Sequence, residues 1–141
     1  MKKQGFRYEE RRTDGSTVLI HAGGFEAEFL APQIGRDDTV IRTPLGVKAQ
    51  RLPHMRMLVS FAEKVNFEGM EVTVPWPEAY ALHKMAINRD RQPADKAEAD
   101  RRKIRNITGF LDAARMGEVY ESLSRKEKKA VEAYKRLWAG G

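Results

Sequence analysis

The first half of the chain alternates apolar and polar residues with the two-residue period of β-strands. FRYEERR and TVLIHAG flank TDGS, and the Asp-Gly pair in that segment is typical of a hairpin turn. In FEAEFLAP, residues 25–32, the apolar residues alternate with Glu26 and Glu28. We therefore predict a strand with an apolar face and a carboxylate face. VIRTPLGVKAQRL, residues 40–52, is predicted to be extended, with interruptions at Pro44 and Gly46.

From Pro53 onwards the apolar residues take helical spacing. HMRMLVSFAEKV predicts a helix that continues to Val65. MEVTVPWP predicts a short strand that Pro75 ends. A helix is predicted over residues 78–88, and its inward side carries Ala79, Leu82, Met85 and Ala86.

The remaining pattern predicts two more helices. One runs from Ala94 to Arg115, with a break near Gly117, and its apolar stripe is Ala97, Ile104, Ile107, Leu111 and Ala114. The second begins at a capping box formed by Ser124 and Glu127. The inward residues of this last helix are Ala130, Val131, Tyr134, Leu137 and Trp138.

This order of elements, with strands first and helices later, predicts an α+β fold. We expect a small mixed or antiparallel sheet packed by helices, followed by a C-terminal helical tail. A chain of 141 residues is long enough to bury a core. We predict a strand-rich core with helices over residues 1–92, and a helical C-terminal region of the same domain over residues 93–141.

Composition excludes several classes of protein. The chain contains no cysteine, which rules out disulfides, thiolate metal sites and a cysteine nucleophile. No apolar run approaches the roughly 18 residues that span a bilayer, and MKKQGFRYEE has no apolar stretch typical of a secretory signal. These features favour a cytoplasmic protein without a membrane partner. The formal charge of +6 favours contact with phosphates, and the alternative is an ordinary, well-solvated basic surface.

Glu26 and Glu28 are the first candidates for chemistry. They lie two residues apart on a strand, so both side chains leave the same face. Two carboxylates in this arrangement can share Mg²⁺, which takes its other ligands from water and phosphate. The alternative is a solvent-facing strand surface that is simply acidic.

Lys84 is the second candidate. It lies beside the buried stripe of the helix over residues 78–88, where the stem can be covered while the ammonium reaches outward. Such a lysine suits a phosphate, although an ordinary surface lysine is the commoner case. His21, His54 and His83 share no metal-ligand spacing, and the sequence contains neither a P-loop nor a dinucleotide-binding glycine motif.

A basic face is predicted on the following helix, from Arg101, Arg102, Lys103 and Arg105, with Arg89 and Arg91 before it. This face suits nucleic acid or an acidic protein, and the alternative is a solvated helix with pairs such as Glu98 and Arg102. No aromatic residue is interleaved among these charges, so the sequence does not imply base stacking. A homodimer formed through an exposed strand edge or the Trp138 helix is compatible with either interpretation.

Four segments carry a resemblance when they are taken in order: GFEAEFLAP, PLGVKAQRL, VTVPWPEAYALHKMAINR and KAEAD. Together they resemble the latter part of a bacterial nucleotidyltransferase-fold family, which is related to the nucleotidyltransferase toxins of abortive-infection systems. The resemblance covers about residues 5 to 115, and YALHK and GVKAQ are its most specific pieces.

The resemblance implies roles for particular residues. Glu28 corresponds to the third metal-binding carboxylate, with Glu in place of Asp, and Lys84 corresponds to a lysine that approaches the nucleotide phosphates. His83, Lys96 and Asp100 match further motif positions that we assign to nucleotide binding. The implied cofactors are Mg²⁺ and a nucleoside triphosphate, in a two-metal nucleotidyl transfer. We therefore expect Glu28 and Lys84 to point into a common hollow.

The chain departs from the family pattern at its beginning. The family's active site starts with a Gly-Ser turn and a pair of aspartates on the first strand, whereas Gly15-Ser16 is followed by TVLIHAG. Asp37 and Asp38 come after the third-carboxylate strand, in the wrong order. We therefore expect an incomplete C-terminal part of an enzyme, which would need a missing N-terminal half or partner protein, or a degenerate relative. The alternative is a non-catalytic interaction module, and whether the chain is an enzyme stays open.

Overall fold

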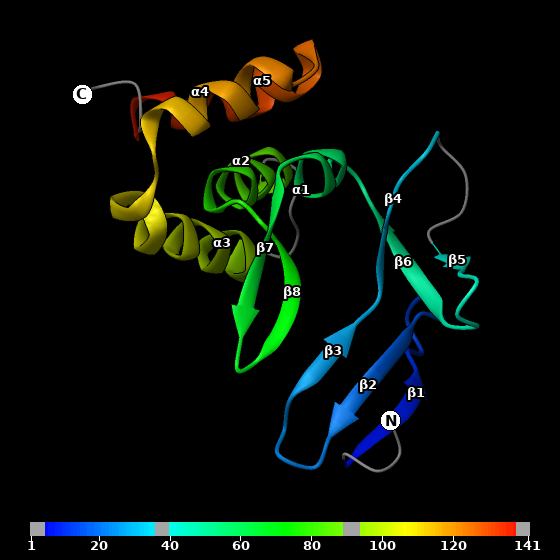
Figure 1. Cartoon of the computed structure of the whole chain (residues 1–141). Coiled ribbons are helices and arrows are strands. Elements are labelled where there is room, and N and C mark those ends of the chain that lie inside the picture. Colours follow the sequence, from blue (N-terminus) through cyan, green and yellow to red (C-terminus); the bar gives the residue numbers. More distant parts are fainter. Residues whose placement is uncertain (1–4, 36–39, 89–93, 138–141) are drawn as a thin grey trace. The chain divides into compact units, whose positions relative to one another are not determined.

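A computed structural model describes residues 5–35, 40–88 and 94–137. The chain forms two compact units, residues 1–53 and 54–141 (Figure 1). The elements of the first unit are β1 (Phe6–Glu10), β2 (Thr17–His21), β3 (Glu26–Glu28), β4 (Leu30–Pro32), β5 (Val40–Arg42) and β6 (Lys48–Leu52). Those of the second unit are α1 (Arg56–Ser60), β7 (Ala62–Phe67), β8 (Met70–Pro75), α2 (Pro77–Asn88), α3 (Ala94–Ile107), η2 (Thr108–Phe110), α4 (Ala113–Ser122), α5 (Arg125–Val131) and η3 (Glu132–Leu137). Small sheets, helices and a helical C-terminal part confirm the predicted α+β class.

The first sheet of the strand-rich unit has the order β1-β2-β3, and both strand pairs are antiparallel. The turn between β1 and β2 confirms the predicted hairpin, because Gly15 adopts a φ of +73° that favours glycine. Asp14 accepts hydrogen bonds from the Ser16 amide at 2.8 Å and the Ser16 hydroxyl at 2.6 Å. These bonds, with the side-chain bond as the larger cause, lower the pKa of Asp14.

The second sheet has the order β4-β6-β5, in which β4 is parallel and β5 antiparallel to β6. The interruption predicted at Pro44 and Gly46 is the turn between β5 and β6, where Gly46 has a φ of +79°. The Lys48 amide donates to the Thr17 hydroxyl at 2.9 Å and joins the two sheets. Among the described residues of this unit, four apolar side chains are buried: Val18, Leu19, Val47 and Ala49.

The strand predicted over residues 25–32 is divided at Phe29 into β3 and β4, and the two parts pair with different sheets. The alternation holds, but the apolar face is not buried, since Phe25 is 72% exposed and Ala27 is exposed too. Alternation assigns side chains to faces, whereas burial depends on whether another layer covers the face.

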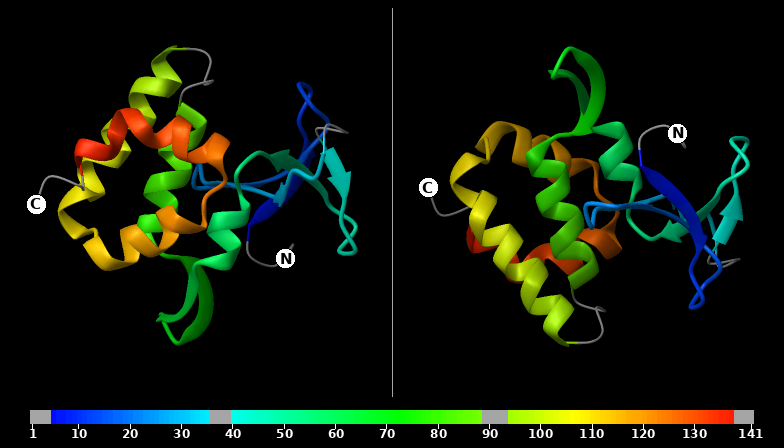
Figure 2. Two further views of the ribbon diagram at one scale, coloured as in Figure 1. Left: turned by 90° about the horizontal axis from the view of Figure 1, so that it is seen from above. Right: turned by 90° about the horizontal axis from the view of Figure 1, so that it is seen from below.

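Helix α2 is the centre of the second unit and contacts α1, α3, α4 and α5 (Figure 2). The predicted inward residues Ala79, Leu82, Met85 and Ala86 are all buried, which confirms the predicted helix. They belong to one contiguous core with Met57, Ala81, Ile104, Met116, Val119, Leu123 and Val131. None of the helices in the described part of the chain is long and apolar enough to cross a membrane.

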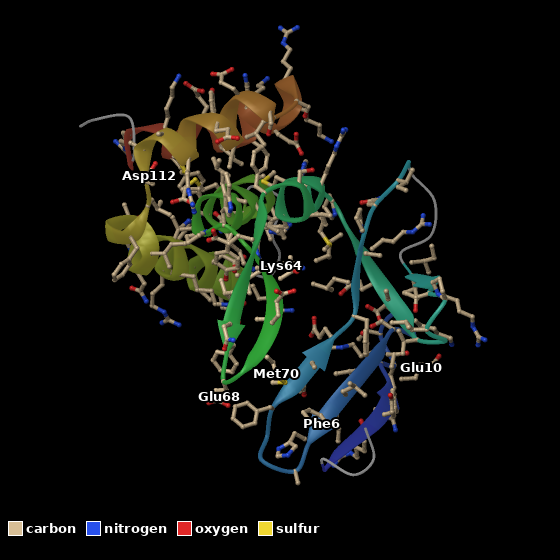
Figure 3. All side chains as sticks on the ribbon, viewed as in Figure 1. Phe6, Glu10, Lys64, Glu68, Met70 and Asp112 are labelled. Carbon is tan, nitrogen blue, oxygen red and sulfur yellow. The ribbon has the colours of Figure 1, made fainter. Side chains whose placement is uncertain are left out.

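The helix predicted to continue to Val65 ends at Ser60, and that prediction is wrong beyond this point. β7 follows instead and pairs antiparallel with β8, with Val65 opposite Val72. The turn between them places both Glu68 and Gly69 at positive φ, and Glu68 and Met70 mark this tip in Figure 3. Pairing with a later strand has outweighed the local helical spacing.

The single long helix predicted from Ala94 to Arg115 is also wrong. α3 ends at Ile107, α4 starts at Ala113, and Gly117 lies inside α4 instead of at a break. Asp112 caps α4 by accepting a hydrogen bond from the Arg115 amide at 2.9 Å (Figure 3). The Asp112 amide donates to Glu78 Oε1 at 2.7 Å, which fixes the chain between the two helices on α2. Ala114 is consequently exposed.

The capping box predicted at Ser124 is confirmed at the start of α5. The Glu127 amide donates to the Ser124 hydroxyl at 3.3 Å, and the Ser124 amide donates to Glu127 Oε2 at 2.8 Å. Val131 is buried and Tyr134 is half-buried, as the predicted inward face requires. Trp138 and the side chain of Leu137 lie outside the described residues.

Candidate functional site

Glu26 and Glu28 lie on the same face of β3, and a single arginine side chain interacts with both carboxylates. Arg11, which follows β1, forms an ion pair with Glu28, and its Nη2 lies 3.2 Å from Glu26 Oε2. Val18 and Ile20, the partners of Glu28 and Glu26 on β2, set this register. The two carboxylates are therefore held so that both reach a single positive centre.

This geometry bears on the predicted Mg²⁺ site. The Arg11 guanidinium stands where a cation would bridge the two carboxylates, and oxygen donors of this kind suit Mg²⁺. Glu26 and Glu28 therefore have the chemistry of Mg²⁺ ligands, and their role as metal ligands stays a prediction. Within residues 5–35, 40–88 and 94–137, no group of three or more His, Cys, Asp or Glu residues could hold a metal.

Lys84 lies on α2 and faces α3. Its Nζ is 3.4 Å from Asp100 Oδ1, and the side chains are 16% and 2% exposed. The same ammonium lies 5.6 Å from the centre of the Tyr80 ring, one helical turn earlier. Burial, and to a smaller extent the negative charge of Asp100, raises the pKa of Tyr80. Tyr80, Lys84 and Asp100 thus form a compact polar cluster between α2 and α3.

The other predicted site residues differ in their surroundings. His83 is buried on α2 at 4% exposure, whereas Lys96 is exposed at the start of α3. The structure therefore places Asp100 against Lys84 and leaves Lys96 at the surface. Asp37, Asp38, Arg89 and Arg91 lie outside the described residues.

Glu28 and Lys84 belong to different units of the chain. The strand-rich unit holds the carboxylate pair and the helical unit holds the lysine cluster. That the two side chains point into a common hollow stays a prediction.

A further pocket lies within the helical unit, and no motif in the sequence indicates it. Its volume is about 320 Å³, and it is lined by Arg56, Met57, Ser60, Phe61, Ser122, Leu123, Ser124 and Glu127. At its edge, His54 Nδ1 lies 3.0 Å from Glu127 Oε1. Burial alone would raise the pKa of Glu127, but hydrogen bonds from Ser124 and His54 outweigh burial and lower it.

Comparison with known proteins supplies the decisive observation. A protein-family model described as "Nucleotidyltransferase" matches residues 2–128, which extend over parts of both units and cover most of the chain. The chain belongs to this nucleotidyltransferase family. No curated protein and no solved structure gives a significant match.

Membership of the nucleotidyltransferase family confirms the coarser part of the resemblance, and the relation to abortive-infection toxins stays a prediction. The matched span contains Glu26, Glu28, Lys84 and Asp100. Two residues of the site were missed from the sequence. Arg11 pairs with glutamates 15 and 17 residues away, and Tyr80 carries no motif of its own.

Proposed function

We propose that this nucleotidyltransferase-family chain binds a nucleoside triphosphate, with Lys84 at the phosphates and Glu28 and Glu26 toward Mg²⁺. The family match over residues 2–128 carries the proposal, because it spans both the carboxylate strand and the lysine helix. The chain would act as the substrate-supporting part of an incomplete or degenerate enzyme. The remaining metal carboxylates would come from a missing N-terminal part or a partner protein.

The surroundings of Lys84 support contact with phosphate. An ammonium group has three hydrogen-bond donors, and one carboxylate oxygen of Asp100 lies 3.4 Å away. Other donors remain for phosphate oxygens at the accessible edge of the side chain. Asp100 positions the ammonium, and the low exposure of the Lys84 side chain means that water screens the charge of the ammonium only weakly. His83 and Lys96 have no assigned step in this proposal.

The carboxylate pair supports a role at the metal. Bound Mg²⁺ would neutralise charge on the triphosphate, and Glu26 and Glu28 would supply two of its oxygen ligands. Arg11 now occupies their shared position, so metal binding requires the guanidinium to move. This competition predicts weak Mg²⁺ binding without nucleotide.

Titration of the purified chain with ATP and MgCl₂ tests the proposal, with thermal stability and backbone amide shifts as readouts. We expect ATP with Mg²⁺ to raise the melting temperature and to shift amides of α2 around Lys84. Lys84→Gln should abolish these changes. Lys126→Gln removes a positive charge from an exposed position on α5 and should leave them intact.

The metal part is tested separately. Glu28→Gln and Glu26→Gln should reduce the Mg²⁺-dependent part of the response, whereas Glu9→Gln, at an exposed glutamate of the same sheet, should not. A wild-type chain with no thermal or spectral response to ATP and Mg²⁺ would show that the proposed function is wrong.

A further inference from the structure

A second concave site lies between α3 and η3, at the C-terminal side of the helical unit. Its volume is about 200 Å³. Side chains from α3 and η3 form the walls of the site. We call it the α3–η3 pocket, and it is lined by Arg101, Ile104, Arg105, Ala133, Tyr134 and Arg136.

Arginines form the polar part of this pocket. Arg101 and Arg105 lie one turn apart on α3, and Glu98 holds both, at 3.3 Å and 2.8 Å. Hydrogen bonds from Arg101 to Tyr134 and then to Glu98 raise the pKa of Arg101. Arg136 forms no ion pair with any residue in the described part of the chain. Three guanidinium groups against one carboxylate leave the pocket positively charged, and two of them are already oriented.

The apolar part of the pocket contains an aromatic ring that is fixed in place. The Tyr134 hydroxyl donates to Asn88 Oδ1 at 2.5 Å, and the Asn88 amide group donates to the Ala97 carbonyl at 2.8 Å. Asn88 is buried, so this chain of bonds anchors the ring to α2 and α3. Ile104 is buried beside it. Tyr134 comes from 29 or more residues beyond the basic face, which is why the sequence of α3 gave no sign of an aromatic partner.

Size and chemistry together indicate the occupant. A volume of about 200 Å³ is smaller than the roughly 300–1,000 Å³ of typical small-molecule sites, which favours one flat group of a longer ligand. Guanidinium planes and a tyrosine ring stack on nucleobases, and arginines also bind the flanking phosphates. Arg102 and Lys103 extend the positive charge along the exposed surface of α3.

We propose that the α3–η3 pocket binds single-stranded nucleic acid, with one base against Tyr134 and the adjacent phosphates on Arg101, Arg105 and Arg136. This binding is independent of the triphosphate proposed for Lys84. It assigns the predicted basic face of α3 to a nucleic-acid strand in preference to an acidic protein, because the pocket supplies an aromatic surface as well as charge.

Fluorescence polarisation with labelled 12-nucleotide single strands of RNA and DNA tests the proposal. Affinity should fall with added salt, with a log–log slope of about −2 if three phosphates are contacted. Arg136→Gln and Arg105→Gln should each weaken binding about five-fold or more. Arg125→Gln, at an exposed arginine on α5, is the matched control and should change it less than two-fold.

The ring is tested by comparing Tyr134→Phe with Tyr134→Leu, since both lose the hydroxyl and only the second loses the ring. We expect Tyr134→Leu to bind about five-fold more weakly than Tyr134→Phe, with melting temperatures recorded for both. Equal binding by these two variants would overturn the base pocket. Three results would overturn single-stranded nucleic acid as the ligand. The first is an equal loss of affinity in Arg125→Gln and Arg136→Gln, and the second is tighter binding of duplex than of single strands. The third is competition by poly-glutamate that equals competition by unlabelled single strands.

Discussion

Both units of the chain hold a basic side chain against carboxylates, but in opposite surroundings. In the strand-rich unit, Arg11 pairs with Glu26 and Glu28, and all three side chains are between 34% and 55% exposed. In the helical unit, Lys84 pairs with Asp100, and the carboxylate is 2% exposed. Water screens the first group and is largely excluded from the second.

The apolar residues follow the same division. The helical unit has one contiguous core around α2, whereas the buried apolar residues in the described part of the strand-rich unit are Val18, Leu19, Val47 and Ala49. Single residues should therefore matter more to the stability of the helical unit. The same difference means that charged groups in the strand-rich unit can exchange partners at low cost.

The largest effect is expected from breaking the interior ion pair. Lys84→Met leaves the Asp100 carboxylate buried without its lysine and should cost about 3 kcal/mol of unfolding free energy. Urea denaturation measures it. The double variant Lys84→Met/Asp100→Leu removes both charges and should recover part of the loss, and a double variant less stable than Lys84→Met would contradict this account.

The next effect compares a buried leucine from each unit. Leu82→Ala in the contiguous core should cost about 3 kcal/mol of unfolding free energy. Leu19→Ala in the strand-rich unit should cost about 2 kcal/mol, because a cavity collapses more easily where fewer buried side chains surround it. Leu45→Ala is the surface control, since Leu45 is 83% exposed, and should be neutral. Denaturation curves followed by far-ultraviolet circular dichroism report all three, and a larger loss for Leu19→Ala would reverse the comparison.

Sequence reasoning succeeded where one element contains the whole signal. The buried face of α2 and the capping box at Ser124 need only local spacing, and both are confirmed. It failed where a distant residue decides the outcome. β8 turns the region after Ser60 into a strand, and Glu78 on α2 receives the Asp112 amide at the break between α3 and α4.

The candidate sites follow the same rule. Glu26, Glu28 and Lys84 could be selected from spacing and resemblance. Arg11 lies in a different segment from the two glutamates, and Tyr134 lies in a different segment from the arginines of α3, so only the fold brings each of them to its site. The exposure of the apolar face of β3 could not be predicted either, because alternation does not reveal whether a second layer covers that face.

A smaller effect is expected at the start of α4. Asp112→Ala removes the side chain that caps the Arg115 amide and should cost about 1 kcal/mol. Asp112→Asn retains an acceptor and should lose less. Thermal unfolding distinguishes them, and equal losses would show that the side chain does not act as a cap.

The His54–Glu127 pair predicts a pH dependence within the helical unit. The pKa of Glu127 is lowered in the folded chain, so its contribution to stability is present above the ordinary value of 4.5 and is lost as pH falls through the lowered folded value. In the Glu127→Gln variant the free energy of unfolding should depend less on pH between about pH 5 and the pH of acid unfolding, because one carboxylate that titrates in this range has been removed. An unchanged profile in the variant would show that other carboxylates account for acid sensitivity.

The smallest effect is expected from the exposed cluster of the strand-rich unit. Arg11→Ala should cost less than about 1 kcal/mol, because surface ion pairs contribute little, and the difference from wild type should shrink in high salt. The same variant should bind Mg²⁺ more tightly, since Glu26 and Glu28 lose the guanidinium that competes with the metal. Calorimetric titration with MgCl₂ measures this gain, and Arg7→Ala is the control, because Arg7 pairs with Glu9 instead. A large loss of stability without tighter Mg²⁺ binding would mean that Arg11 holds the sheet together and that the two carboxylates exist to bind it.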